Sequence, residues 1–300
     1  MRTLIVGSGF VGGAVAAHLT RVGGAPVLAS RQPGAAVGAQ PWTELDVTDP
    51  AACARVVREV SAEALVLVHG PSDVTWCDAH PAEAMAGHLQ AARNIVAAAG
   101  DRRLVLISTD NVFDGTSAVC DETTATAPHN AYGRAKLAAE QVFAGAADAT
   151  VLRVSLVYGW EPPESAKWLN FFASCAHRLL AGGAVTVPYD QWTTPVLVDD
   201  VAAVTSAVLA VRDRPLLHLG GPQRISRADW ATLIAQELGA DPALVVAEPR
   251  AHGRYAGRPE NSCLTSSLLG REPATAGVPV RDVRAGARLL CEQAVWGSRA

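Results

Sequence analysis

Residues 3–12 read TLIVGSGFVG, and this stretch decides the fold. The apolar run Thr3–Val6 predicts a buried strand, and the GxGxxG motif after it opens a helix, which is the context that dinucleotide-binding loops require. In such loops the first glycine permits a tight turn, the second lets the backbone approach a pyrophosphate, and the third lets the helix pack on the strand. N–H groups at the helix N-terminus then face the anion. The residues predicted to contact a dinucleotide here are Gly7, Gly9, Phe10, Val11 and Gly12.

The rest of the chain continues this alternation of short apolar runs and longer helical stretches. Further strands are predicted at Pro26–Ala29, Ala64–Val68, Leu104–Ser108, Thr150–Val154, Val185–Pro188 and Leu216–Leu219. Helices are predicted from the Asp49 cap to about Val60, and over Pro81–Ala99, Pro128–Ala144, Ala166–Leu180, Asp199–Val211 and Ser226–Leu238. The strands are rich in Val, Ile and Leu with little alternation, so helices must cover both faces of a parallel sheet.

This pattern predicts an α/β protein with a Rossmann-type doubly wound parallel sheet and a smaller C-terminal substrate-binding lobe. Past about residue 213 the chain becomes richer in Pro and Gly and less regular. We therefore assign residues 1–158 and 184–212 to the dinucleotide-binding domain. Residues 159–183 and 213–300 are assigned to the lobe, which is expected to pack on the sheet.

Composition excludes several classes of protein. In 300 residues, hydrophobic side chains make up 49% and charged ones 18%, which is not the composition of a disordered chain. Twenty-five basic residues against twenty-nine acidic ones, with no basic run, argue against a nucleic-acid surface. Six scattered cysteines without CxxC predict reduced thiols and no metal site. The apolar stretch Leu4–Leu19 is too short for a membrane span, so we expect a cytoplasmic protein without a targeting segment.

The end of the second strand indicates which dinucleotide is bound. NAD sites usually carry Asp or Glu there to hold the ribose hydroxyls, whereas this chain has Ser30 and Arg31. A hydroxyl and a guanidinium suit a 2′-phosphate, so NADP, as NADPH, is favoured over NAD. Asp46 and Val47 are predicted to lie along the adenine, although Asp46 is equally typical of a surface acid before the Asp49 helix cap.

A second motif carries the reaction chemistry. Tyr132 and Lys136 form YxxxK, and residues at i and i+4 share one face of a helix. A tyrosine is a poor acid near neutral pH, but an ammonium one turn away stabilises its phenolate. Upstream, Ser108 and Thr109 end a predicted parallel strand, which is where open α/β sheets bind their ligands. Their hydroxyls are candidates for contact with a substrate carbonyl.

With these residues in place, the chain resembles the extended short-chain dehydrogenases/reductases, and among them the dTDP-4-dehydrorhamnose reductase family. That family's S-T-D-Y-V-F-D-G signature is similar to Ser108–Gly115, and its P-x-x-x-Y-G-x-x-K stretch to Pro128–Lys136. Further similar segments follow in the family's order almost to the end of the chain: Leu152–Ser155, Asn170-Phe171, Asp190-Gln191, Pro195–Val201 and Arg258–Leu264.

The resemblance implies an NADPH-dependent reductase of a C4 ketone on a nucleotide-linked 6-deoxyhexose. It implies that Thr109 polarises the ketone, Tyr132 protonates the alkoxide and Lys136 assists, while Tyr132 and Lys136 also contact the cofactor together with Gly70 and Pro71. A nucleotide sugar is the implied partner, and a homodimer is the candidate assembly. The residues implied to bind substrate are Ser108, Asp110, Asn111, Val112, Asn170, Gln191, Trp192 and Arg258.

Departures from the family pattern gather on the substrate side. Asn111, Leu156 and Val196 replace the usual Tyr, Trp and Thr, and the His69–Ser72 segment replaces the commoner H-x-A-A. His88 stands where many extended members have Asn, and it belongs either to a proton relay or to helix packing.

Two other functions stay open from the sequence. One is a sugar-nucleotide epimerase or dehydratase with tightly bound NAD, which Ser30 and Arg31 argue against. The other is a non-catalytic NADP-binding regulatory subunit similar to that of methionine adenosyltransferase.

Overall fold

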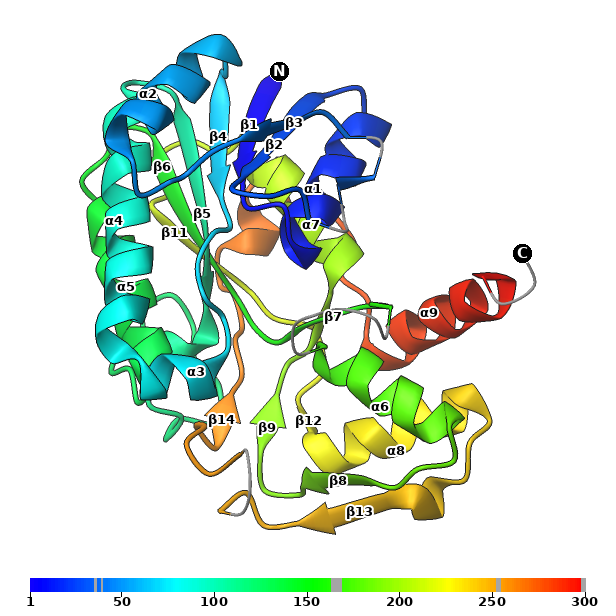
Figure 1. Ribbon diagram of the computed structural model, residues 1–300. Helices are drawn as coiled ribbons and strands as arrows, with labels where there is room; N and C mark the ends of the chain where they lie inside the picture. The colour runs from blue at the N-terminus through cyan, green and yellow to red at the C-terminus, as the bar shows by residue number, and fades with distance from the viewer. Residues whose placement is uncertain (35–36, 39, 163–168, 252–254, 298–300) are drawn as a thin grey trace.

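The computed structural model describes residues 1–34, 37–38, 40–162, 169–251 and 255–297. Its larger part is a parallel sheet with helices on both faces, and a smaller lobe lies against the carboxyl end of that sheet (Figure 1). The sheet runs β3-β2-β1-β4-β5-β6-β11 with every neighbouring pair parallel. Its strands are β1 (Arg2–Val6), β2 (Ala25–Ser30), β3 (Trp42–Glu44), β4 (Ala64–Leu67), β5 (Arg103–Thr109), β6 (Ala149–Val154) and β11 (Leu216–Leu219).

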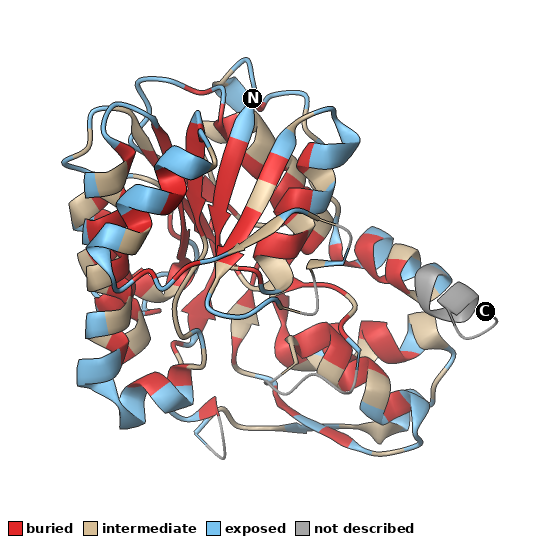
Figure 2. Cartoon of the chain, turned by 45° about the horizontal axis from the view of Figure 1, so that its top comes forward, coloured by how far each residue is buried: buried red, intermediate tan, exposed pale blue. Residues whose placement is uncertain are grey.

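Two helical layers cover this sheet. On one face lie α2 (Pro50–Glu59), α4 (Pro81–Ala99) and α5 (Ala131–Phe143); on the other lie α1 (Phe10–Arg21) and α7 (Val198–Val208). The central strands are buried through most of their length, as apolar side chains on both faces require (Figure 2). Strand order reverses between β1 and β4, and doubly wound sheets bind their ligands at the carboxyl ends of the strands beside such a reversal. The predicted doubly wound fold is confirmed.

The lobe has its own core under short strand pairs. β7 (Val157–Tyr158) pairs with β10 (Val196–Leu197), β8 (Val185–Pro188) pairs with β13 (Val245–Glu248), and β9 (Trp192–Thr193) lies between β12 (Ile225–Ser226) and β14 (Asn261–Ser262). Its helices are α6 (Phe171–Leu180), α8 (Arg227–Leu238) and α9 (Val283–Gly297). The Trp230 ring stacks on Phe171 at 4.7 Å and meets Tyr158 edge-on at 5.2 Å, which anchors α6 and α8 to β7.

Two strands belong to the other domain from the one predicted for them. Leu216–Leu219 was assigned to the lobe, but it pairs with β6 as the edge strand of the main sheet. Val185–Pro188 was assigned to the dinucleotide-binding domain, but it pairs with β13 of the lobe. Composition along the chain does not reveal the hydrogen-bonding partner of a short strand, so these two assignments were wrong. Helix α6 begins at Phe171, later than the predicted Ala166; residues 166–168 lie outside the described residues.

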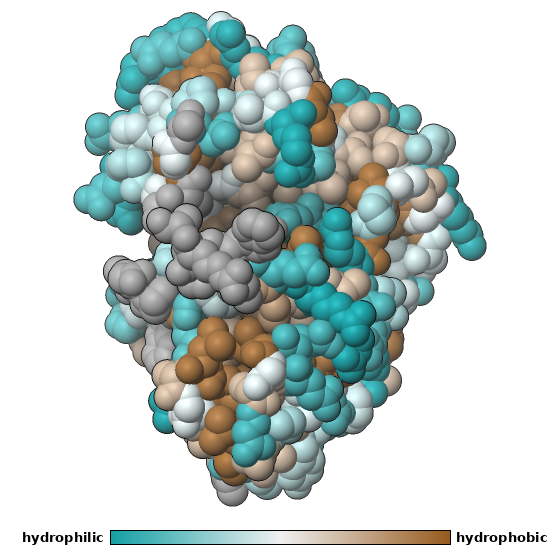
Figure 3. Space-filling view, turned by 90° about the vertical axis from the view of Figure 1, so that its right-hand side faces the viewer, coloured by the Kyte–Doolittle hydropathy of each residue, from teal (hydrophilic) through white to brown (hydrophobic). Residues whose placement is uncertain are grey.

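Several features outside the reaction centre are relevant to function. Within the described ranges, no helix combines the length and hydrophobicity that crossing a bilayer needs, and no cluster of His, Cys, Asp and Glu is suited to a metal ion. All six cysteines are free thiols. Hydrophobic side chains gather on the lower half of the face in Figure 3, over the lobe. Leu180 and Val246 are among the large hydrophobic side chains that the lobe exposes. These residues do not establish an interface, so the expected homodimer stays a prediction.

Candidate active site

The glycine loop after β1 fits a dinucleotide pyrophosphate. Gly7 has φ of +119°, and its N–H donates to the carbonyl of Ala29 at 2.9 Å. Gly9 precedes α1 without any side-chain cap, and a Cβ there would meet open space. A Cβ on Gly12 would collide with the carbonyl of Gly7, so this close helix–strand contact requires glycine. The N-terminus of α1 follows this loop directly, and helix N-termini favour anions.

At the end of β2, the two residues predicted to select NADP differ in their surroundings. The Ser30 hydroxyl donates to the carbonyl of Gln32 at 2.6 Å, accepts from Trp42 Nε1 at 2.9 Å, and lies 2.7 Å from the Ser8 hydroxyl. These contacts make Ser30 a loop-building residue, and its direct contact with the phosphate stays a prediction. Arg31 is exposed beside it and is suited to a 2′-phosphate.

The predicted adenine contacts also differ from each other. Asp46 is exposed and accepts two hydrogen bonds from Thr48, which lower its carboxyl pKa. The Val47 side chain is buried in the core, and its carbonyl accepts from Asn94 Nδ2 at 2.9 Å. A side-chain contact from Val47 to the cofactor is therefore wrong, because the alternation of burial turns this residue inward.

The loop after β4 is locked to α4 by a histidine. Gly70 has φ of +126°, and a Cβ there would collide with the His88 ring. His88 is 3% exposed and its Nε2 lies 2.9 Å from the carbonyl of Pro71. Burial lowers the pKa of His88 to about 3 and that of His69 to about 4, so both rings are neutral at physiological pH. His88 thus packs and hydrogen-bonds as a neutral imidazole, and is not an imidazolium at neutral pH.

Thr109, Tyr132 and Lys136 meet at the carboxyl end of β5. The Tyr132 phenol interacts with the Thr109 side chain, and burial raises the pKa of that phenol. Lys136 is 4% exposed and donates from Nζ to the carbonyl of Ile107 at 2.7 Å. Burial lowers the pKa of Lys136 to about 8. The His88 ring lies 5.8 Å from the Tyr132 ring, so the loop after β4 borders the same place. The structure brings together all three predicted catalytic residues.

The turn after β5 is fixed to the start of α5. Asn130 caps α5 by accepting from the Gly133 N–H at 2.8 Å and donates to Asn111 Oδ1 at 2.9 Å. Asp110 is 5% exposed and accepts from Thr109, Asn111 and the Ser155 hydroxyl. Burial raises the pKa of Asp110 to about 6. Asp110 and Asn111 thus hold Thr109 and Tyr132 in one arrangement.

Two residues of this turn predicted to bind substrate face the core. The Ser108 hydroxyl donates to Glu140 of α5, because Ser108 shares the strand face of Leu106, which packs against that helical layer. Val112 is fully buried against Phe113. Substrate contact by the Ser108 hydroxyl or the Val112 side chain is therefore wrong.

On the lobe side, one predicted substrate residue is structural. Asn170 caps α6, accepts from the Ala173 N–H at 3.2 Å, and donates to the carbonyl of Gly159 at 2.9 Å. Its contact with substrate through the amide is thus not supported. The family's N-F pair is, at this position, a helix N-cap followed by a core aromatic residue.

The other predicted lobe residues are Gln191 just before β9, Trp192 on β9, and Arg258 on the loop before β14. We call these residues, together with Arg227, the first residue of α8, the lobe wall. Gln191 is 1% exposed; its Nε2 donates to the carbonyl of Pro259 at 3.1 Å, but its Oε1 has no partner among the described residues. Trp192 stacks under the Arg224 guanidinium at 4.1 Å. The Arg258 guanidinium lies 5.7 Å from the Tyr255 ring.

Arg227 was missed by sequence reasoning. It is the first residue of α8 and is 3% exposed, with its guanidinium 4.7 Å from the Phe171 ring. Its Nε has no hydrogen-bond partner in the described part of the chain, and burial lowers its pKa to about 10, still charged at neutral pH. A signal was present: the Ser226–Asp229 capping box places this arginine in a first helical turn, where cations are disfavoured.

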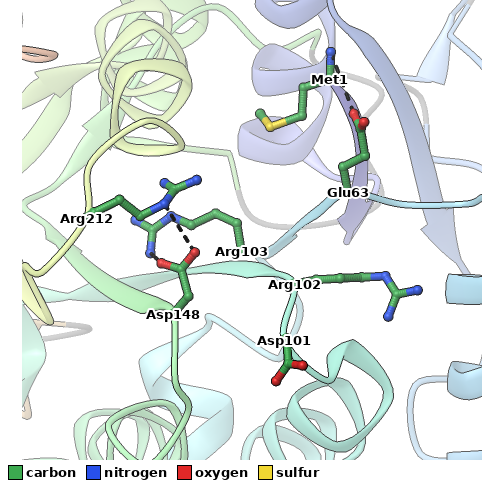
Figure 4. A pocket seen from close by; sticks show the side chains of 7 residues that line it. All are labelled: Met1, Glu63, Asp101, Arg102, Arg103, Asp148 and Arg212. Carbon is green, nitrogen blue, oxygen red and sulfur yellow. Dashed lines mark hydrogen bonds and ion pairs between the residues drawn. The ribbon is translucent and has the colours of Figure 1, made fainter.

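One groove lies away from the reaction centre. A groove of about 550 Å³ opens at the amino ends of the strands, opposite the catalytic edge, and is bordered by Arg102, Arg103 and Arg212 (Figure 4). Asp148 lies between two of them, 2.9 Å from Arg103 Nη1 and 3.3 Å from Arg212 Nε. Because open α/β sheets bind ligands at their carboxyl ends, we assign no function to this groove.

Comparison with known proteins identifies the family. Residues 1–293 match the family described as RmlD substrate binding domain. The chain is 32% identical to dTDP-4-dehydrorhamnose reductase of Mycobacterium tuberculosis, over 94% of this chain and 90% of that protein. It is 30% identical to methionine adenosyltransferase 2 subunit beta of Danio rerio, over 63% and 60%. The crystal structure of Bacillus anthracis dTDP-4-dehydrorhamnose reductase in complex with NADP superposes with a TM-score of 0.81, at 21% identity, over 97% and 99%.

Proposed function

The chain belongs to the RmlD substrate-binding-domain family, and from that premise we propose that it is an NADPH-dependent reductase of a nucleotide-linked 4-keto-6-deoxyhexose. The observation that carries the proposal is the meeting of Thr109, Tyr132 and Lys136 at the carboxyl end of β5, within the fold that presents an uncapped glycine loop to a dinucleotide. That arrangement has the parts a ketone reduction needs: an acid, an oriented hydroxyl and a cation.

The chain's residues divide the chemistry between them. NADPH, when bound, supplies the hydride. As the carbonyl carbon is reduced, its oxygen gains negative charge, which the Thr109 hydroxyl stabilises and the Tyr132 phenol protonates. Burial raises the pKa of Tyr132, so the phenol is protonated and ready to donate before the reaction. The Lys136 ammonium then stabilises the phenolate that is left.

Cofactor choice is assigned to Arg31, and substrate binding to the lobe wall. The exposed Arg31 guanidinium at the end of β2 supports a contact with the 2′-phosphate of NADP. Gln191 and Arg227 carry buried polar atoms without a partner among the described residues, and a nucleotide sugar can supply those partners. Arg258 adds a second cation for the negative charge of that substrate.

Turnover tests the proposal directly. We expect the purified protein to oxidise NADPH when mixed with dTDP-linked 4-keto-6-deoxy sugars, followed by NADPH absorbance, and to convert the sugar to the 4-hydroxy product, followed by mass spectrometry. NADH is expected to be a weaker reductant. Absence of turnover across dTDP- and UDP-linked 4-keto sugars would refute the proposal.

A second candidate function has one specific observation in its favour. The similarity to a methionine adenosyltransferase beta subunit over 63% of this chain allows a regulatory protein that binds NADP without turnover. Tight NADP binding without reduction of any sugar, together with co-purification of a methionine adenosyltransferase, would favour it. The assembled Thr109, Tyr132 and Lys136 favour the reductase.

A further inference from the structure

Glu140 is a buried carboxylate that the proposed reaction does not use. It lies on α5 one turn beyond Lys136 and is 5% exposed. Arg153 of β6 donates to it through Nε, at 3.1 and 3.2 Å, and through Nη2, at 2.7 Å. The Ser108 hydroxyl of β5 donates to the same carboxylate. One acidic side chain therefore joins α5 to both strands that flank the reaction centre.

Glu140 completes a row of contacts between helix and strand. Residues spaced by four lie on one face of a helix, and here three consecutive turns of α5 each present one polar side chain to the end of β5. We call this row the α5–β5 seam; its contacts are Tyr132 to the Thr109 side chain, Lys136 to the Ile107 carbonyl, and Glu140 to the Ser108 hydroxyl. The contacts of Tyr132, Lys136 and Glu140 thus fall on three successive residues of β5, from Ile107 to Thr109.

Stability alone is a weak reason for an ion pair in this position. Both side chains of the Glu140–Arg153 pair are less than a tenth exposed, and buried ion pairs contribute little compared with well-packed apolar residues. The carboxylate does have an electrostatic effect on the site. Burial lowers the pKa of Lys136, and Glu140 opposes that shift.

We propose that Glu140 is a positioning residue for the reductase: its carboxylate keeps the Lys136 ammonium charged beside the Tyr132 phenol and, through Ser108, fixes the end of β5 that carries Thr109. This inference rests on the proposed function. It separates into two effects, a charge effect on Lys136 and a hydrogen bond that holds β5, and each can be removed without the other.

The other titratable groups around the pair do not replace this charge. Lys136 faces two neutral rings, that of His69 on the loop after β4 and that of His88 on α4. On the far side, Arg153 has His218 of β11 at 3.4 Å, and burial lowers the pKa of that imidazole as well. Glu140 is thus the anion that supports Lys136 within the described surroundings.

Glu140→Gln tests the charge effect, because glutamine can still accept from Ser108. We expect kcat to fall about 10- to 100-fold, with the KM for NADPH unchanged within about threefold. The alkaline limb of the kcat–pH profile, set by deprotonation of Lys136 near pH 8 in the wild type, is expected to move about one unit lower. Ser108→Ala removes the hydrogen bond and leaves the charge, so kcat should fall by less and the limb should stay in place.

A readout that needs no turnover separates this inference from the proposed function. The sequence contains two lysines, Lys136 and Lys167, so side-chain NMR with labelled lysine gives two titrating signals. Loss of one signal in Lys136→Met assigns them. In ligand-free protein, the Lys136 signal is expected to titrate at lower pH in Glu140→Gln than in the wild type, even if no sugar in the panel is reduced.

A matched control lies at the other end of the same strand. Arg103, the first residue of β5, pairs with Asp148 at 2.9 Å far from the reaction centre. Asp148→Asn should lower the melting temperature and leave kcat and the pH profile unchanged. If Glu140→Gln folds poorly because Arg153 is left unpaired, Glu140→Gln/Arg153→Met removes both charges and is expected to restore the fold but not the Lys136 titration.

The outcomes decide the inference. A lowered Lys136 titration in Glu140→Gln and in the double variant, with Asp148→Asn unaffected, supports it. A Lys136 titration and a kcat–pH profile that are unchanged in a folded Glu140→Gln protein would overturn it, as would a loss of kcat that only follows the loss of melting temperature in all variants.

Discussion

The α5–β5 seam and the lobe wall treat buried polar groups in opposite ways. Along the seam, the Lys136 ammonium and the Glu140 carboxylate are both hydrogen-bonded within the chain. Across the site, Gln191 Oε1 and Arg227 Nε are buried and have no partner among the described residues. The two regions lie on different parts of the fold, the seam in the main sheet and the wall in the lobe (Figure 1).

The difference teaches where a ligand is needed. Groups that must be in place before reaction are fixed by the protein itself, which costs no reorganisation when charge develops. Groups that recognise substrate can be left incomplete, because an unsatisfied buried donor or acceptor gains most from the partner that a correct ligand brings. Seam variants should therefore change kcat, and lobe-wall variants should change KM.

The largest effect is expected at the centre of the seam. Tyr132→Phe removes the acid and keeps the ring, so kcat should fall by about 10³-fold while NADPH still binds, measured by quenching of tryptophan fluorescence. A phenylalanine variant with kcat close to that of the wild type would end the assignment of Tyr132 as the acid.

The lobe wall should respond in the other parameter. Arg227→Met keeps the length of the side chain and removes its charge, so the KM for the nucleotide sugar should rise about 10- to 100-fold with a much smaller change in kcat. Arg227→Lys, which keeps the charge, should recover part of that loss. The melting temperature of Arg227→Met should not drop, since a buried polar atom without a partner is removed. A fall in kcat with unchanged KM would break the comparison.

At the end of β2, a side chain bonded within the chain, Ser30, stands next to an exposed one proposed to bind a ligand, Arg31. This pair tests the same contrast as the seam and the lobe wall. Arg31→Ala is expected to raise the KM for NADPH about tenfold and the KM for NADH less than twofold, because only NADPH has the 2′-phosphate. Ser30→Ala is the control: its hydroxyl is bonded within the loop, so the ratio of the two KM values should change little. Equal effects of Arg31→Ala on both cofactors would refute the contact.

The smallest effect concerns stability and pH. Burial raises the pKa of Asp110 from about 3.8 in the unfolded chain to about 6, so the fold binds an extra proton between these values. This stabilisation is complete below about pH 3.8 and is lost as pH rises through 6. Asp110→Asn, which stays neutral, should therefore gain about 1–3 kcal/mol over the wild type between pH 4 and pH 7, measured by chemical denaturation. A constant difference across that range would contradict it.

The sequence was sufficient for the sheet and the reaction centre. The motifs GxGxxG after β1 and YxxxK on α5 each depend only on the spacing of residues within one turn or helix. Local structure preserves that spacing, so the sequence alone is enough to interpret them. The positions of Thr109, Tyr132 and Lys136 follow once a parallel sheet is assumed, because the carboxyl ends of its strands meet at one edge.

What failed was the direction of individual side chains. Ser108 and Thr109 are neighbours with similar hydroxyls. Ser108 nevertheless bonds Glu140 in the core, whereas Thr109 interacts with Tyr132 of the reaction centre. A motif cannot distinguish these, since strand alternation and the twist at a strand end decide which side chain reaches the crevice. Arg227 was missed for the opposite reason: its importance comes from burial by Phe171, which is distant in sequence.

The locked loop after β4 also constrains how this chain can change over generations. The His88 ring fills the space that any side chain at position 70 would enter, and Gly70 holds a φ that other residues rarely adopt. Exchange of Gly70 therefore meets both a collision and backbone strain, and a smaller residue at position 88 would remove the collision but leave the strain. Glycine is therefore expected to persist at position 70 among descendants of this chain, even where position 88 changes.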